Sequence, residues 1–208
     1  MILLKQALPE VFDHNLLETG DDTVTHIYCD MDGVLVDFDI GFKQISGGKL
    51  PAYYDEINQS HKIWTTIASQ PNQGIDWWSN LPKTNDCDVL WKYITTNYSI
   101  VKILSSTGSR KSKSNSADIG KRRWLMTHLA PAPDDSNIIL VDSSEAKQKY
   151  AEGSNHILID DLPSNIQQWR AAGGIAILHV SAENTINQLK RLQSSTKQES
   201  YGYSWSNV

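Results

Sequence analysis

Five short runs of aliphatic and β-branched residues are the feature that most restricts how this chain can fold. They span residues 24–29, 100–104, 137–141, 156–159 and 174–179. Apolar runs of this length, rich in Val and Ile, are typical of strands buried on both faces of a parallel sheet. The segments between them carry apolar residues at helical spacing over 86–97, 119–129 and 164–172. The alternation predicts an α/β fold, with a parallel sheet flanked by helices through right-handed crossovers.

The stretch 39–81 interrupts this alternation. It contains two glycine-rich breaks and a helical pattern over 61–68, and no run in it is convincing as a strand. We therefore predict a small, mostly helical cap over 39–81, inserted into an α/β core made of residues 1–38 and 82–193. Residues 1–23 are expected to form a peripheral lead-in to the first strand. Residues 194–208, rich in Ser and without periodicity, are expected to be a flexible tail.

Size and charge limit the kind of partner. A chain of 208 residues suits one domain with a small insertion. The net charge of -5 argues against stable binding of duplex nucleic acid, although basic residues cluster at 110–113 and 121–123. A small phosphorylated substrate suits this balance better, and the sequence leaves a homodimer open.

The compartment is predicted from cysteine content and hydropathy. Cys29 and Cys87 do not make a disulfide framework, and the apolar start of the chain is too short for a signal peptide. No run approaches the roughly 20 apolar residues of a membrane-spanning helix. We expect a soluble, cytoplasmic protein that does not associate with membranes.

Pairs of acidic residues follow two of the predicted strands. Asp30 and Asp32 come directly after the first strand, and Asp160 and Asp161 end the fourth. The carboxyl ends of parallel strands meet at one edge of the sheet, where ligands bind in open α/β folds. Four carboxyl groups cannot all stay ionised close together unless a cation or a proton intervenes. The pattern predicts a site for Mg²⁺ and a phosphate group.

The other strand ends add groups that suit a phosphate. Ser105 and Ser106 end the second strand and offer hydroxyl and amide donors. Lys147 follows the third strand, and Lys121 lies near the start of a later predicted helix. A positioned anionic nucleophile and nearby positive charge are the parts that phosphoryl transfer needs.

In chain order, these segments resemble the four motifs of the haloacid dehalogenase (HAD) superfamily of phosphohydrolases. The motifs are Asp30-Met31-Asp32-Gly33-Val34, Ile103-Leu104-Ser105, a downstream lysine and Ile157-Leu158-Ile159-Asp160-Asp161, and together they span most of the chain. The wider match over 30–38, with an aromatic helical cap and Ser105-Ser106, resembles the 5'(3')-deoxyribonucleotidase branch. The resemblance implies a Rossmann-like HAD core and Mg²⁺-dependent hydrolysis of a phosphomonoester through an aspartyl-phosphate.

The resemblance also implies roles for the acidic residues. Asp30 would attack phosphorus, and Asp32 would protonate the leaving alcohol and later activate water. Mg²⁺ would be held by an Asp30 carboxylate oxygen, the Asp32 backbone carbonyl, and the acids Asp160 and Asp161. The order of those last two, one a direct ligand and one outside the coordination shell, stays open.

Ser105 and Ser106 would bind the phosphate, with a lysine to offset its charge. Lys147 is the first choice, because it lies after the third strand and ahead of the last motif. Lys121 competes, although the long polar stretch 108–116 departs from the family pattern and makes its alignment uncertain. Both lysines can serve.

Aromatic residues are the candidates for substrate selection. Phe38, Trp77 and Trp78, with Tyr53 and Trp64 in the cap, are flat groups suited to stacking on a nucleobase, although packing alone explains cap aromatics equally well. The preferred function is therefore that of a 5'-nucleotidase on (deoxy)ribonucleoside monophosphates. The alternatives are a polynucleotide end phosphatase, another small-metabolite HAD phosphatase, or a catalytically silent HAD-like module that binds a phosphorylated ligand. Dehalogenation is disfavoured, because it needs neither Asp32 nor a Mg²⁺ site.

Overall fold

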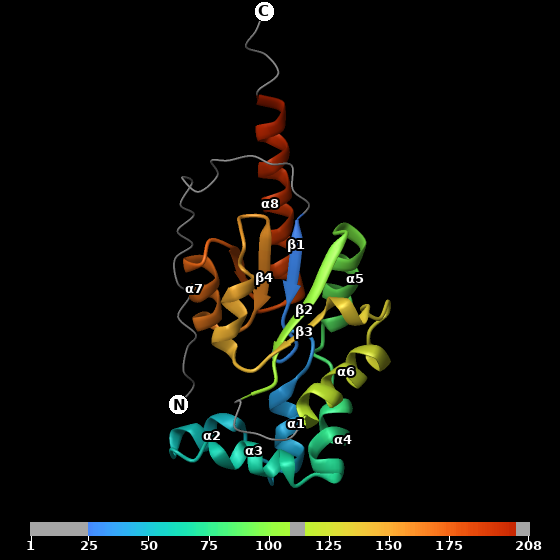
Figure 1. Cartoon of the computed structure of the whole chain (residues 1–208), viewed down its shortest axis with the longest axis vertical. Helices are drawn as coiled ribbons and strands as arrows, with labels where there is room; N and C mark the ends of the chain where they lie inside the picture. The colour runs from blue at the N-terminus through green and yellow to red at the C-terminus, as the bar shows by residue number, and fades with distance from the viewer. Residues whose placement is uncertain (1–24, 109–114, 203–208) are drawn as a thin grey trace, which may run out of the picture.

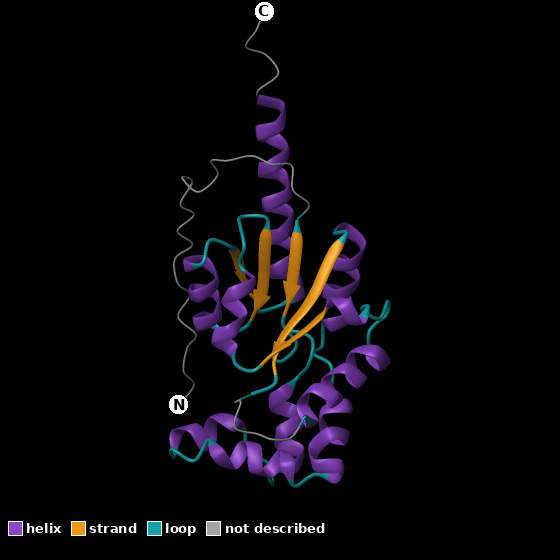
Figure 2. Cartoon of the chain, viewed as in Figure 1, coloured by secondary structure: helices purple, strands orange, loops and turns teal. Residues whose placement is uncertain are grey.

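A computed structural model describes residues 25–108 and 115–202 of the chain. Its centre is a sheet of five parallel strands in the order β3-β2-β1-β4-β5 (Figures 1 and 2). The strands are β1 (His26–Cys29), β2 (Ile100–Ser106), β3 (Ile138–Val141), β4 (His156–Asp160) and β5 (Ile175–Leu178). All five predicted strands are confirmed within one or two residues at each end. The α/β fold with a parallel sheet is therefore confirmed.

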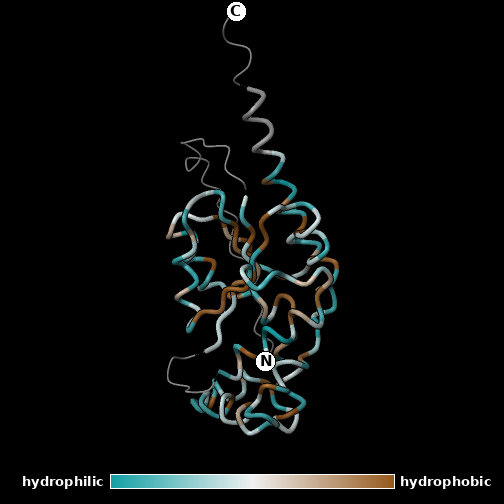
Figure 3. Tube along the Cα trace, turned by 45° about the vertical axis from the view of Figure 1, so that its right-hand side comes forward, coloured by the Kyte–Doolittle hydropathy of each residue, from teal (hydrophilic) through white to brown (hydrophobic). Residues whose placement is uncertain are grey.

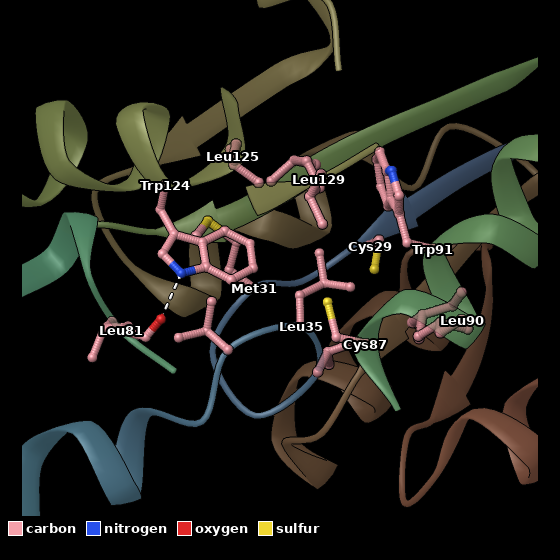
Figure 4. Close-up of a cluster of buried hydrophobic side chains, with 14 of the residues drawn as sticks. Cys29, Met31, Leu35, Leu81, Cys87, Leu90, Trp91, Trp124, Leu125 and Leu129 are labelled. Carbon is pink, nitrogen blue, oxygen red and sulfur yellow. Dashed lines mark hydrogen bonds between the residues drawn. The ribbon is translucent and has the colours of Figure 1, made fainter. Parts of the chain in front are cut away.

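Helices cover both faces of this sheet. The face that carries Ile27 and Cys29 packs against α5 (Cys87–Asn97), α6 (Ser116–His128) and α8 (Ala182–Gly202). The opposite face packs against α7 (Pro163–Ala171) and the 3₁₀ helix η4 (Ser144–Tyr150). Side chains alternate between the two faces along a strand, so the apolar runs of the sequence supply two cores at once. Figure 3 shows hydrophobic segments gathered at the sheet, and Figure 4 shows part of the larger core, where Cys29 and Met31 meet α5 and α6.

The segment between β1 and α5 is helical, as predicted for the cap. It forms α1 (Phe38–Ile45), α2 (Pro51–Glu56), α3 (His61–Ala68), the 3₁₀ helix η2 (Pro71–Gly74) and α4 (Ile75–Ser79). Figure 1 places these helices beyond the carboxyl ends of the strands. We propose the same division into core and cap for the folded chain, with boundaries at 39 and 81.

Close contacts join the cap helices to the core. The indole Nε1 of Trp124 on α6 donates to the Leu81 carbonyl at 2.7 Å, a contact drawn in Figure 4. Gly41 on α1 also lies close to the core residue Pro82, since a Cβ there would be 3.3 Å from Pro82 Cδ. The cap is thereby held on the rim of the sheet where the acidic residues emerge.

The C-terminal region differs from the prediction. We expected no regular structure from residue 194, whereas α8 continues as a helix to Gly202 and extends beyond the sheet in Figure 1. A helix propagates easily once its first turns are fixed, and Leu189 of α8 is fully buried against the core. The predicted lead-in of residues 1–23 lies outside the described residues, as do residues 203–208 of the predicted tail.

Among the helices that the structure describes, none is both long enough and apolar enough to cross a membrane.

Candidate active site

Strand register places the two pairs of acids side by side. Cys29 of β1 is paired with Ile159 of β4, and the Asp30 amide donates to the Ile159 carbonyl at 3.0 Å. Asp30 and Asp160, the next residues on these strands, therefore emerge together at the carboxyl edge of the sheet. Asp30 is 4% exposed and Asp160 is fully buried. The structure thus joins acids that lie 130 positions apart in the chain.

Three carboxyl groups converge at this point. Oxygen atoms of Asp30, Asp160 and Asp161 lie within 4.8 Å of one another. Burial, together with the charges of Asp30 and Asp160, raises the pKa of Asp161 to about 7. Gly33 makes room for this carboxyl group, because a Cβ at Gly33, whose φ is +76°, would lie 2.2 Å from Asp161 Oδ2. A hard divalent cation suits this set of oxygen ligands, since its charge removes the repulsion.

Lys147 is buried between two of these acids. Its Nζ lies 2.8 Å from Asp30 Oδ2 and 2.7 Å from Asp160 Oδ2. Burial lowers the pKa of Lys147, and the adjacent carboxylates Asp30 and Asp160 more than reverse this, so that the net shift is upward. Lys147 lies on the short helix η4, which directly follows β3 in the chain. Lys147, the first choice for a phosphate lysine in the sequence, thus lies against Asp30.

Both carboxylate oxygens of Asp160 accept hydrogen bonds from groups of the protein. Its Oδ1 accepts from the Leu162 amide at 2.9 Å and from Asn165 Nδ2 at 3.0 Å. Its Oδ2 accepts from Lys147 Nζ at 2.7 Å and from Asn165 Nδ2 at 2.9 Å. These bonds fill its acceptor positions and leave Asp161, lying against Gly33, as the acid of this pair that is open to a cation.

Asn165 was not among the residues predicted from the sequence. It is buried in the first turns of α7, which begins at Pro163 directly after the loop from β4. The signal was present in the sequence as an amide side chain five positions after Asp160, on a helix that Pro163 starts. Such a residue points back toward the end of the preceding strand.

Lys121 forms the other half of the site. Its Nζ lies 2.6 Å from Asp32 Oδ2, 2.9 Å from Ser105 Oγ and 2.7 Å from the Ser106 carbonyl oxygen. The side chain is fully buried. Lys121 and Lys147 thus both reach the site, and each holds a different acid of the first motif.

Asp32 differs from Asp30 in its surroundings. Its side chain keeps 31% exposure, whereas Asp30 is buried against Lys147. Burial raises the pKa of Asp32 and the charge of Asp30 adds to this, while Lys121 opposes it. Asp32 Oδ1 is shielded from solvent and has no hydrogen-bond partner among the described residues. Two neighbouring carboxyl groups in different environments are suited to different roles.

The predicted serines differ in what they offer. Ser105 is fully buried, and its Oγ accepts from Lys121. Ser106 is half-buried, and its Oγ accepts from the Gly108 amide at 3.2 Å. Both lie at the end of β2, beside β1 in the sheet. They therefore lie at the same edge of the sheet as Asp30.

The aromatic candidates separate into packed and exposed residues. Trp78 is only 3% exposed, so in this structure it offers no open face to a planar ligand, which favours the packing alternative. Phe38 and Trp77 are half-buried, and their rings pack edge to face with their centres 5.4 Å apart. Trp64 is 49% exposed, and a Cβ at Gly108 would lie 3.6 Å from two of its ring carbons. Trp64 therefore lies where the cap meets the loop after β2.

Comparisons with known proteins give likenesses of fold only. No protein-family model and no curated protein matches the chain. Solved structures that resemble it include a HAD hydrolase of family IA, variant 3, from Entamoeba histolytica, with 15% identity, a TM-score of 0.44, and coverage of 80% of this chain and 88% of that one.

Two further structures are similar. A hydrolase from Streptococcus pneumoniae has 16% identity and a TM-score of 0.46, with coverage of 81% of this chain and 100% of that one. A HAD-superfamily hydrolase from Ehrlichia chaffeensis has 15% identity and a TM-score of 0.45, with coverage of 83% and 99%. Likenesses at this level carry no argument about activity.

Proposed function

We propose that this protein is a Mg²⁺-dependent phosphomonoesterase of the HAD type that acts through an aspartyl-phosphate on Asp30. The observation that carries the proposal is the pairing of two acids with two buried lysines at one edge of the sheet. Lys147 contacts Asp30, and Lys121 contacts Asp32 and Ser105. A nucleophile, a proton carrier and two cations around one space are the parts that phosphoryl transfer requires.

Mg²⁺ fits the acidic cluster. Asp30, Asp161 and the backbone carbonyl of Asp32 would hold the ion. Asp160 would not bind the ion directly and would orient Lys147 instead. The three converging carboxyl groups and the raised pKa of Asp161 support this assignment. When bound, the cation offsets the charges of the phosphate and of the carboxylates.

The protein's own residues carry the chemistry in two steps. A carboxylate oxygen of Asp30 attacks phosphorus, the bond from phosphorus to the ester oxygen breaks, and Asp32 gives its proton to the leaving alcohol. Water then attacks phosphorus in the aspartyl-phosphate and passes a proton to Asp32. The bond from phosphorus to Asp30 breaks, which releases inorganic phosphate and restores both acids. The raised pKa of Asp32 suits a group that must start protonated.

Lys121, Ser105 and Lys147 position the phosphate. Lys121 contacts Ser105 and Lys147 contacts Asp30, so each ammonium group lies beside a residue proposed to meet the phosphate. Lys121 also contacts Asp32, the proton carrier. We assign both lysines to phosphate binding.

A (deoxy)ribonucleoside monophosphate is the proposed substrate. The support is the exposed ring of Trp64 beside Gly108, two residues after Ser106. Phe38, at the start of α1, and Trp77 of the cap are half-buried. Flat apolar faces at the mouth of a phosphate site favour a planar group on the substrate.

A phosphate-release screen tests this function. Wild-type protein should release phosphate from nucleoside monophosphates with Mg²⁺ and lose that activity with a chelator. The same screen should include sugar phosphates and oligonucleotides carrying 5' or 3' phosphates. Faster turnover of an oligonucleotide would favour an end phosphatase. Tight binding of a phosphorylated ligand without turnover would favour a non-catalytic module.

Replacing the nucleophile is the matched control. Asp30→Asn should reduce phosphate release by at least about 10⁴-fold, because the amide cannot form the covalent intermediate. Circular dichroism should show an unchanged fold. Full activity in Asp30→Asn would refute the mechanism.

A further inference from the structure

Trp78 and Lys121 are buried against each other across the border between cap and core. The Nζ of Lys121 lies 5.0 Å from the centre of the Trp78 ring. Trp78 belongs to α4 of the cap, and Lys121 belongs to α6 of the core. Both side chains are almost fully removed from solvent. A desolvated cation near an aromatic ring is attracted by the negative face of that ring.

Gly120 makes this approach possible. A Cβ at Gly120 would lie 2.2 Å from Trp78 Cβ and 2.9 Å from the Ile75 carbonyl oxygen. The helices α4 and α6 therefore touch at the residue directly before Lys121. The sequence places a residue without a side chain where the indole meets the backbone of α6.

The surroundings of the Lys121 ammonium explain what the indole does. Asp32 Oδ2, Ser105 Oγ and the Ser106 carbonyl oxygen lie on the side of the candidate active site. The Trp78 ring lies near the same ammonium, with its centre 5.0 Å from Nζ. An indole attracts the cation without competing as a strong hydrogen-bond acceptor. The ammonium is thereby kept among Asp32 and the two serines.

We propose that Trp78 is a positioning residue, whose indole holds the Lys121 ammonium in place to bind the substrate phosphate. The inference rests on the proposed function and deepens it. It gives the inserted cap a part in the phosphate site itself, separate from any selection of the rest of the substrate. Loss of the indole should then weaken the binding of every phosphate, including inorganic phosphate.

Inorganic phosphate is the probe, because it has no base or sugar to stack on the cap. Its affinity is measured by isothermal titration in the presence of Mg²⁺. Site-specific replacement of Trp78 by trifluorotryptophan keeps the size of the ring but removes most of the negative charge of its face. We expect affinity for phosphate to fall about fivefold. Unchanged affinity would overturn the inference, because a merely structural role needs only the volume of the ring.

A double-mutant cycle gives a second test. Trp78→Leu should weaken phosphate binding about tenfold in wild-type protein and have little further effect when Lys121 is already Met. Equal losses in both backgrounds would show that Trp78 does not act through Lys121. Trp91→Leu is the control, because Trp91 is a buried core residue on α5 and hydrogen-bonds the Pro131 carbonyl. It should lower stability and leave phosphate affinity unchanged.

The outcomes separate this inference from the proposed function. Wild-type protein that neither binds phosphate nor releases it from any ester would refute both. Wild-type protein that does both, with the fluorinated variant binding phosphate equally well, would refute the inference alone.

Discussion

At the scale of one residue, Lys147 shows how two carboxylates stabilise a buried positive charge. Its ammonium lies between Asp30 and Asp160, and all three side chains are almost fully buried. A buried ion pair adds little stability relative to apolar residues, but removal of one partner leaves an uncompensated charge. We therefore expect the lysine to support the fold of the site in addition to its proposed part in phosphate binding.

Lys147→Met should destabilise the protein and inactivate it. We expect the free energy of unfolding at pH 7 to fall by about 3–5 kcal/mol, because two buried carboxylates lose their counter-charge. Urea denaturation measures the change. Lys149→Met, at an exposed position on the same short helix η4, is the control and should alter stability by less than about 0.5 kcal/mol. Equal effects of the two substitutions would contradict this explanation.

Asp161 makes stability depend on pH when no divalent cation is present. Its pKa of about 7 in the folded protein is above the ordinary value of 3.8. The folded state therefore holds a proton that the unfolded state releases in the window between these two values. The stabilisation from that proton is complete below the unfolded pKa and is lost as pH rises through the folded pKa.

Urea denaturation across this pH window, with a chelator present, should show the loss. Asp161→Asn has no titrating group at this position, so its free energy of unfolding should fall less steeply with rising pH. Added Mg²⁺ should flatten the dependence in wild-type protein, because the cation replaces the proton. Parallel curves for wild type and Asp161→Asn in chelator would exclude Asp161 as the cause.

At the scale of elements, α8 shows how contacts with the core can hold a helix that has few apolar residues. Leu189 is fully buried in the larger core, whereas Asn187 on the same helix is exposed. The first turn of α8 is also held by the Ala182 amide, which donates to the carboxylate of Asp86. The helix therefore depends on tertiary contacts more than on its own propensity.

Leu189→Ala should lower the free energy of unfolding by about 2–5 kcal/mol, because it leaves a cavity between α8 and the sheet. Asn187→Ala should change it by less than about 0.5 kcal/mol. Thermal or urea unfolding followed by circular dichroism measures both variants. A similar small effect for Leu189→Ala would mean that α8 is not anchored by this residue.

At the scale of the whole molecule, the cap and core are joined by several short contacts. Trp124 donates to Leu81, Gly41 lies against Pro82, and Gly120 lies against Trp78. Such contacts favour unfolding of the two parts in one cooperative step. They also place the cap residue Trp78 beside Lys121.

Unfolding should therefore be a single transition. Tryptophan fluorescence reports on Trp64, Trp77 and Trp78 in the cap as well as on core residues, and far-ultraviolet circular dichroism reports on all helices. Both signals should change at the same urea concentration. Gly120→Val, which forces α4 away from α6, should make the two signals change at different urea concentrations. Two transitions in wild-type protein would instead show that the cap is an independent unit.

The sequence by itself determined the strands, and it placed the candidate site at the carboxyl edge of the sheet. Apolar runs end in Asp30, Ser105 and Asp160, and a strand that is buried on both faces can be read from its composition alone. The order of the strands brought the predicted acids, serines and lysines to one edge. The sequence pattern could locate these residues because each one lies directly after a strand or on a helix close to a strand end.

Only the tertiary structure decided how these residues divide their contacts. It placed Lys147 on Asp30 and Lys121 on Asp32, and it filled the acceptor positions of Asp160 through Asn165. It also buried Trp78 against Lys121 instead of leaving its face open to a base. The physical reason is that pairing between buried charges and rings depends on distances across packed elements. Such distances are set by the packing of α4, α6 and α7, and no local pattern in the sequence specifies them.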